Sequence, residues 1–232
     1  PEFGSADPTR WRAFRYRPGT GSYLEVQAAS AATGELRPDA GRAFWLVARA
    51  AHQVDTAPVA GRSTPTGGPY RLTLEPGWNQ VGNPYLFTVA WADVHAEDAS
   101  GPVALEPPVG WDEAAQKYGD ADVALLRPFD GYWVRNPSSQ PIALSIPPRE
   151  SPIPVPLGQR PQAPASRADS SGWQVRIVAR CGAQSDSRNA FGVHANARDG
   201  DDTEDRSDPP PAPGPAVRIC FSRPLPGVFR IQ

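Results

Sequence analysis

The sequence predicts an all-β fold, and three observations support this prediction. The 232-residue chain contains 29 prolines and 21 glycines, which interrupt long helices and favour short strands joined by turns. Its seven tryptophans, eight phenylalanines and six tyrosines supply bulk for a hydrophobic core. A segment in which a Pro/Gly turn leads into an aromatic strand occurs twice. We therefore expect a sandwich-like or barrel-like unit built from two related halves, followed by a small C-terminal β-module.

The two copies of this segment read LRPDAGRAFWLV at 36–47 and LRPFDGYWV at 126–134. A third turn-and-strand segment, LEPGWNQVGNP, lies between them at 74–84. Segments of this kind build a β-scaffold and show no reaction chemistry of their own. Because Trp45 and Trp133 fall inside the expected strands, we interpret both as core residues.

The pattern of apolar and polar residues locates the other elements. The clearest strand is 70–75, where alternation indicates one buried and one solvated face. A hairpin is expected between 132–135 and 142–146, and a short surface helix at 111–118, where acidic residues come early and Lys117 comes late. The remaining expected strands span 11–16, 23–27, 44–54, 78–81, 173–181 and 217–221.

Composition shifts divide the chain into four parts. Residues 1–7 resemble a cloning tag followed by a disordered start, and 8–148 form the aromatic-repeat β-domain. Residues 149–168 are rich in proline, which favours a stiff linker or a strap along the first domain. Residues 169–232 are expected to form the small β-module, which contains an acidic loop.

Charge and motif content exclude several classes of function. The formal net charge is −2, so nothing favours nucleic acid, and no apolar run is long enough for membrane insertion. The three histidines, His52, His95 and His194, are too far apart for a zinc motif. No nucleophile elbow, phosphate loop or complete dinucleotide loop occurs. We therefore predict that the protein is not an enzyme and has no cofactor, with calcium as the one candidate ion.

The candidate calcium site is a cluster of six acidic residues within 199–208. Calcium takes six to eight oxygen ligands, which a dense carboxylate cluster supplies, although the spacing is not that of an EF-hand. The alternative is a solvated loop that charge repulsion keeps extended. Asp186 and Asn189 would add ligands if their turn folded over the loop, but they suit an ordinary Asx turn equally well. The candidate ligands are Asp199, Asp201, Asp202 and Asp205.

The two cysteines, Cys181 and Cys220, predict a disulfide within the small module. Such a bridge would add about 4 kcal/mol in the chain-entropy model, which suits a unit with little core. The alternative is a pair of buried free thiols. Strand parity argues against the bridge, because Cys181 shares the apolar face of its strand whereas Cys220 shares parity with Arg218. A bulge or a strand end would have to reconcile the two faces.

Four aromatic residues in or near expected loops are the candidates for ligand binding. A flat ring exposed at the surface stacks on the apolar face of a sugar, so these residues raise the possibility of a carbohydrate-binding module. Burial of the same side chains in the core is the competing interpretation. The candidates are Trp78, Trp91, Trp111 and Tyr118.

The segment GWNQVGNP at 77–84, the repeated Gly-aromatic-Trp-aliphatic motif and the acidic DGDDTED segment at 199–205 resemble modules of large bacterial extracellular proteins. This resemblance implies a secreted or surface-displayed protein whose partners are the neighbouring domains of a longer chain, and a glycan or another surface protein as a further ligand. The function we expect is a non-catalytic structural or adhesive module. The alternatives are a carbohydrate-binding module and an accessory domain or fragment of a secreted hydrolase.

Overall fold

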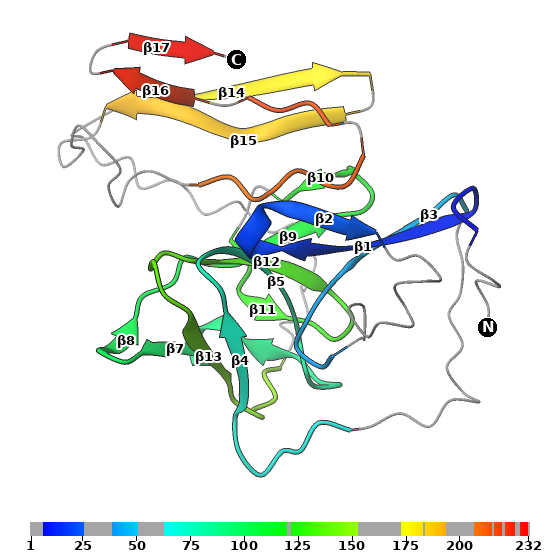
Figure 1. Ribbon diagram of the computed structural model, residues 1–232, viewed down its shortest axis with the longest axis vertical. Helices are drawn as coiled ribbons and strands as arrows, with labels where there is room; N and C mark the ends of the chain where they lie inside the picture. Colours follow the sequence, from blue (N-terminus) through cyan, green and yellow to red (C-terminus); the bar gives the residue numbers. More distant parts are fainter. Residues whose placement is uncertain are drawn as a thin grey trace. The chain divides into compact units, whose positions relative to one another are not determined.

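The structure, a computed structural model, describes residues 7–25, 39–50, 63–119, 122–152, 173–182, 184–193, 207–214, 216–219, 221–225 and 228–231. It confirms the all-β prediction, with several antiparallel sheets that do not close into a single barrel (Figure 1). No helix in these ranges is long and apolar enough to cross a membrane. The short helical elements are the 3₁₀ turns η1 (Pro18–Thr20) and η2 (Trp91–Asp93).

The chain forms two compact units. Unit 1 comprises Pro1–Gly110 and Val123–Pro154, and unit 2 comprises Trp111–Asp122 and Val155–Gln232. The segment Trp111–Asp122 therefore groups with the C-terminal module, whereas the sequence analysis assigned it to the larger domain. The predicted Pro-rich linker at 149–168 lies outside the described residues from residue 153 onward.

Unit 1 contains three sheets and one short ladder. The first sheet has the order β2-β1-β3, with β1 (Trp11–Arg17), β2 (Ser22–Glu25) and β3 (Trp45–Ala48). In the second, β5 (Gly77–Gly82) pairs with β12 (Gly131–Asn136), which also pairs with β9 (Val109–Asp112). The third has the order β4-β13-β7-β8, with β4 (Tyr70–Leu74), β13 (Ile142–Ile146), β7 (His95–Asp98) and β8 (Gly101–Val103). The ladder pairs β6 (Val89–Ala90) with β11 (Leu125–Leu126).

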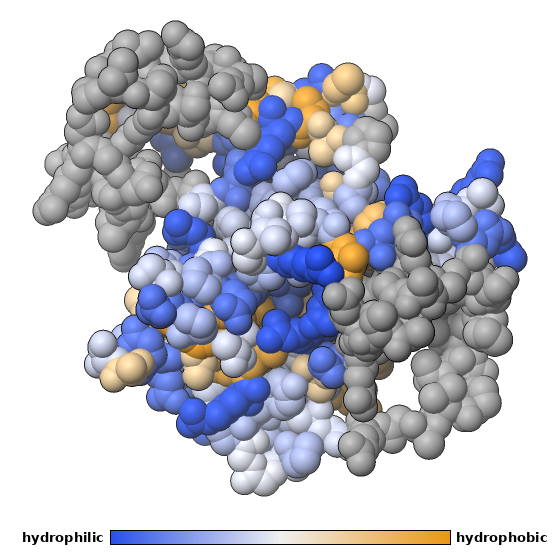
Figure 2. Space-filling view, viewed as in Figure 1, coloured by the Kyte–Doolittle hydropathy of each residue, from blue (hydrophilic) through white to orange (hydrophobic). Residues whose placement is uncertain are grey.

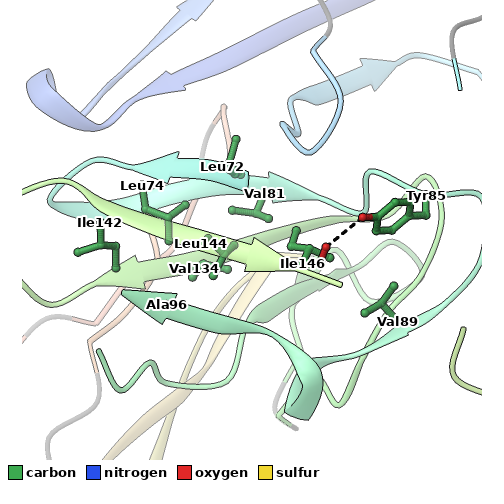
Figure 3. Packing of buried hydrophobic residues seen from close by; sticks show 10 residues of the cluster. All are labelled: Leu72, Leu74, Val81, Tyr85, Val89, Ala96, Val134, Ile142, Leu144 and Ile146. Carbon is green, nitrogen blue, oxygen red and sulfur yellow. Dashed lines mark hydrogen bonds between the residues drawn. The ribbon is translucent and has the colours of Figure 1, made fainter. Parts of the chain in front are cut away.

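The main core of unit 1 lies between the sheet of β4 and β13 and the sheet of β5 and β12 (Figure 3). Alternation along β13 turns Ile142, Leu144 and Ile146 to one face, where all three are fully buried, as the sequence pattern predicts. Strands β5 and β12 contribute Val81 and Val134 from the other side. Tight burial of branched side chains from two facing sheets is the packing expected of a β-sandwich. The remaining members of the cluster are Leu72, Leu74, Tyr85, Val89 and Ala96.

The sheet of β5 and β12 is covered on its other face by the hairpin of β1 and β2 (Figure 1). Trp133 points to this side and is only 3% exposed, which confirms its prediction as a core residue. The Tyr16 ring meets it edge to face at a centroid distance of 5.0 Å, and the Trp78 ring does so at 6.5 Å. The backbone N–H of Tyr16 also donates to the Gln80 side chain at 2.8 Å. Unit 1 is therefore built of three layers.

The two copies of the turn-and-strand segment meet the same residue of β5. Tyr132, from the second copy, pairs with Val81 along one edge of β5. Arg42, from the first copy, forms an isolated bridge with Val81 along the other edge. Trp45, however, is only partly buried, and the predicted strand 44–54 is limited to β3 in the described residues. The related halves thus share a central strand at equivalent positions, but only the second copy delivers its tryptophan to the core.

The expected helix at 111–118 is wrong. These residues form a hairpin in which β10 (Lys117–Tyr118) pairs with the end of β9, Lys117 opposite Asp112. The Asp112 carboxylate accepts a hydrogen bond from the Ala115 N–H at 2.9 Å, and Gln116 adopts a left-handed conformation with φ of 51°. A capped tight turn uses the early acidic residue as well as a helix would, so the charge pattern alone does not separate the two structures.

Unit 2 contains two described two-stranded ribbons, β14 (Trp173–Cys181) with β15 (Gln184–Val193), and β16 (Phe221–Leu225) with β17 (Val228–Ile231). The first ribbon has a register shift between Ile177 and Ala179. Gly192 is required at its position, because a Cβ there would lie 2.1 Å from the Trp173 carbonyl oxygen. The hairpin of β9 and β10 contacts β15 through Lys117, whose Nζ donates to the Ser187 hydroxyl at 3.0 Å.

Candidate functional site

The candidate site in unit 1 is a small pocket beside η2, β7 and β8. Its volume is about 220 Å³, somewhat below the range of roughly 300–1,000 Å³ that is usual for small-molecule sites. Most of the side chains around it are apolar, and His95 brings an imidazole. Polar and apolar atoms contribute about equally to the surface of the pocket, so it suits a small ring that also carries hydrogen-bonding groups. The lining residues are Trp91, Val94, His95, Ala96, Pro102, Val103, Ala104 and Leu105.

Trp91 is held in place by backbone hydrogen bonds at both ends of η2. Its N–H donates to the Ala124 carbonyl at 2.8 Å, and its own carbonyl accepts from the Val94 N–H at 3.0 Å. The indole is partly buried and packs against the main core. The indole therefore contacts the core on one side and lines the pocket on the other. An indole in this position can stack on a ring-shaped ligand, but it has no group for acid–base chemistry.

The other three candidate aromatic residues lie on strands, are partly buried and pack against other rings. Trp78, on β5, packs edge to face against Trp133. Trp111, on β9, packs edge to face against Tyr118, on β10, with centroids 5.0 Å apart. The Tyr118 hydroxyl also donates to the Pro210 carbonyl at 2.5 Å. These residues were expected in or near loops, and the structure places them at or near strand ends, because Pro and Gly neighbours mark strand ends here as well as loops.

The candidate calcium ligands Asp199, Asp201, Asp202 and Asp205 lie outside the described residues. Within the described part of the chain, no group of three or more His, Cys, Asp or Glu side chains is placed to hold a metal ion. The calcium site therefore remains a prediction.

Two acidic residues of unit 2 that the sequence analysis linked to this loop do interact. Burial raises the pKa of Asp208, and the negative charge of Asp186 raises it further, while Arg218 and Arg188 oppose these effects. The Asp186 carboxylate accepts a hydrogen bond from the Ile219 N–H at 2.8 Å. Asp186 thus fixes the segment that follows the proline run to β15, and Asp208 lies in the same electrostatic environment.

Replacing Asp208 with asparagine is expected to stabilise unit 2 at neutral pH. A pKa raised by folding means that the native state favours the protonated carboxyl, so stability is greatest below the ordinary value of 3.8 and falls as pH rises through the raised value. Asp208→Asn should therefore raise the unfolding temperature at about pH 7 and lose this advantage at about pH 3.

Differential scanning calorimetry at both pH values measures this difference. Glu113→Gln, which removes an exposed carboxylate in the same unit, is the matched control and should change little. If Asp208→Asn changed the unfolding temperature equally at both pH values, the change in stability would not come from ionisation of the Asp208 carboxyl group.

Cys181 carries an exposed free thiol at the end of β14, so the structure shows no disulfide at this residue. Cys220, its predicted partner, lies outside the described residues. The exposed position differs from the parity argument, which placed Cys181 on the apolar face of its strand, because most of β14 is exposed on both faces.

Sequence reasoning missed the role of the polar side chains in the aromatic segments. The Asn79 amide nitrogen donates to the carbonyls of Glu75 and Gly77, at 2.7 and 2.9 Å, and its oxygen accepts from the Glu75 N–H. The Asn83 amide nitrogen donates to the carbonyls of Phe87 and Leu126, at 2.7 and 2.9 Å. The signal was the position of each asparagine beside a turn, where amide side chains satisfy backbone groups.

Tyrosine hydroxyls also form hydrogen bonds with backbone groups of unit 1. The Tyr132 hydroxyl accepts from the Arg127 N–H at 2.8 Å, and burial raises its pKa to about 12. The Tyr85 hydroxyl donates to the Ile146 carbonyl at 3.0 Å and accepts from the Tyr70 N–H at 3.1 Å. These side chains connect strands that are far apart in the sequence.

Comparison of the chain with protein-family models, curated proteins and solved structures finds no match in any of the three. The functional proposal below therefore rests on the chain's own residues and their contacts.

Proposed function

We propose that this chain is a non-catalytic structural module of a secreted or surface-displayed bacterial protein, in which unit 1 acts as a rigid spacer between neighbouring domains. The observation that carries the proposal is that the most prominent residues of the sequence motifs stabilise unit 1 itself. Trp133 is buried, and the amides of Asn79 and Asn83 are engaged with backbone groups of unit 1 itself.

Residues that serve a ligand are normally placed where the ligand can reach them, with hydrogen-bonding groups left for it. In unit 1 the amides of Asn79 and Asn83 and the hydroxyl of Tyr132 bond to backbone groups of turns and strands, which is what a scaffold needs. The face shown in Figure 2 is mainly hydrophilic over the described residues, with hydrophobic residues in small patches. This surface suits a module that folds around its own core.

Carbohydrate binding is the second candidate, and Trp91 is the observation that favours it. Its indole lines the pocket beside His95, where a sugar ring would find an apolar face and a hydrogen-bonding group. The rings of Trp78, Trp111 and Tyr118 pack against other aromatic residues, so Trp91 gives the stronger support for this function.

The two functions make different predictions for Trp91 and Trp133. To test them, the chain is fused between a membrane anchor and a reporter domain that is displayed on a bacterial surface. The amount of reporter displayed and its resistance to protease are then measured. A spacer should keep the reporter displayed, and Trp133→Ala should reduce display. Trp91→Ala, which removes a partly buried ring, should reduce display less than Trp133→Ala does.

A glycan array on the purified chain provides the second readout. The structural proposal predicts no specific glycan signal. A glycan that binds the wild-type chain and is lost in a folded Trp91→Ala variant would reject the spacer function in favour of carbohydrate binding.

A further inference from the structure

A proline-rich segment of unit 2 lies beside the hairpin of β9 and β10 (Figure 1). Its sequence, SDPPPAPG at 207–214, contains four prolines, and residues 207–212 belong to no strand or helix. The hairpin residues 111–118 and this segment are parts of the same compact unit. Because three consecutive prolines cannot join a β-ladder, other contacts must hold the segment. Residues 207–214 are hereafter called the proline segment.

The burial of the proline segment indicates a polyproline II conformation. Each proline fixes its own φ at about −65° and disfavours the α conformation of the residue before it, so a run of prolines favours this extended helix with three residues per turn. Pro209 and Pro210 are buried, Pro211 is exposed, and Ala212 and Pro213 are half-buried. Two covered positions followed by one exposed position is the pattern of a threefold helix that lies on a surface.

The hairpin offers an aromatic pair and a hydrogen-bond donor to this segment. Trp111 and Tyr118 are directly opposite each other in the β9–β10 ladder, and their half-buried rings meet edge to face at a centroid distance of 5.0 Å. The Tyr118 hydroxyl donates to the Pro210 carbonyl at 2.5 Å. A proline has no N–H, so its carbonyl is the only backbone group that can form a hydrogen bond, and a tyrosine hydroxyl is a suitable donor. Surfaces lined by aromatic rings are a recurring means of recognising proline-rich segments.

Contacts that do not involve the proline segment support the hairpin. The Lys117 Nζ donates to the Ser187 hydroxyl at 3.0 Å, and the Arg188 guanidinium donates to the Gly119 carbonyl. Both hydrogen bonds join the hairpin to β15. The position of the aromatic pair therefore has a support that is independent of the proline segment, and a preformed site loses less entropy when it binds a ligand.

We propose that the β9–β10 hairpin is a recognition site for polyproline segments and that the proline segment is its intramolecular ligand. The ligand class follows from the contacts, because a polyproline helix is rigid, apolar and free of N–H groups, and offers carbonyl acceptors at its surface. Since ligand and site belong to one chain, the effective concentration of the ligand is on the order of millimolar, and a proline-rich partner must displace it in order to bind. The inference concerns unit 2 and does not depend on the spacer function proposed for unit 1.

The intact chain with an undocked proline segment tests the site. The double variant Pro209→Ser, Pro210→Ser removes the two buried rings and should make the hairpin accessible. A synthetic peptide of sequence SDPPPAPG is titrated into the protein while NMR follows the indole N–H resonance of Trp111, which Trp111→Phe assigns. We expect saturable binding to the double variant and binding at least about tenfold weaker to the wild-type chain, where the resident segment competes with the peptide.

Two kinds of control identify the contacts. A peptide in which alanine replaces all four prolines keeps the length and charge but not the preformed helix, and should bind at least about tenfold more weakly. Tyr118→Phe, introduced into the double variant, should weaken binding of the proline peptide about 3- to 10-fold, because it removes one hydrogen bond. Tyr70→Phe removes a hydroxyl that donates to the Ala40 carbonyl at 2.6 Å in unit 1, and should leave peptide binding unchanged.

Absence of binding to the double variant, equal affinity for the double variant and the wild-type chain, or equal affinity for the two peptides would each overturn the proposal. Hydrogen exchange in fragments from β14 and β15 shows beforehand whether the double variant keeps unit 2 folded. If that protection is lost, the wild-type chain is titrated with peptide up to about 10 mM, above the effective concentration of the resident segment. A shift of the Trp111 resonance that the alanine peptide does not cause then supports the proposal, and the absence of a shift overturns it.

Discussion

Replacing Trp133 with alanine is expected to lower the free energy of unfolding of unit 1 by about 3–5 kcal/mol. The indole is 3% exposed, and the rings of Tyr16, Tyr23 and Trp78 meet it edge to face. Its removal leaves a cavity between the β1–β2 hairpin and the sheet of β5 and β12, and the surrounding rings lose their common partner. The loss of stability is measured by a urea titration that is monitored by hydrogen exchange. Peptides from β5 and β12 are used because they report on unit 1 alone.

Trp173→Ala is the matched control, because it removes the same side chain from a site that is 54% exposed in unit 2. It should leave hydrogen exchange in β5 and β12 unchanged. If Trp133→Ala changed the exchange of these peptides by less than about 1 kcal/mol, the indole would be peripheral, and the role assigned to the repeated segment would be wrong.

The sequence predicted the elements whose pattern is local and complete. Residues 70–75 and 142–146 alternate without interruption, and the structure pairs them as β4 and β13 with their apolar faces in the main core. Period-two alternation is enough for this result because a strand exposes alternate side chains to opposite faces. Trp133 was predicted correctly for the same reason, since it lies in the middle of a strand flanked by apolar residues.

Elements that depend on distant partners were not predictable in the same way. The hairpin at 111–118 contacts β15, some seventy residues later, through Lys117 and Ser187, and nothing local distinguishes it from a helical turn. The position of the first copy of the repeated segment is set by Val81, which bridges to both Arg42 and Tyr132. Of the candidate aromatics, only Trp91 lines a pocket, whereas Trp78 and Trp111, each beside a glycine, pack against other aromatic rings that the local sequence does not reveal.

Replacing Asn136 with alanine is expected to cost about 2–4 kcal/mol, although the residue is polar and follows no catalytic motif. Its side chain is 1% exposed. The amide nitrogen donates to the carbonyls of Leu74 and Gln140, at 3.1 and 2.8 Å, and the amide oxygen accepts from the Ser138 N–H at 2.9 Å. Alanine leaves these backbone groups without partners, at the point where β12 turns into β13 beside the end of β4. Urea titration of unit 1, read in the same peptides, measures the loss.

Asn136→Asp tests the hydrogen bonds of the side chain without changing its size. The carboxylate has the same size but would face the two carbonyl oxygens of Leu74 and Gln140, so folding should raise the pKa of the new carboxyl group. Asn136→Asp should therefore be much less stable than the wild type at pH 7 and recover part of the loss near pH 4, where the protonated carboxyl can donate one hydrogen bond. Ser139→Ala, in the same turn and exposed, should cost about 0.5 kcal/mol or less at both pH values. A loss for Asn136→Asp that is independent of pH would indicate that the site tolerates the charge, and the donor role of the Asn136 amide would then have to be abandoned.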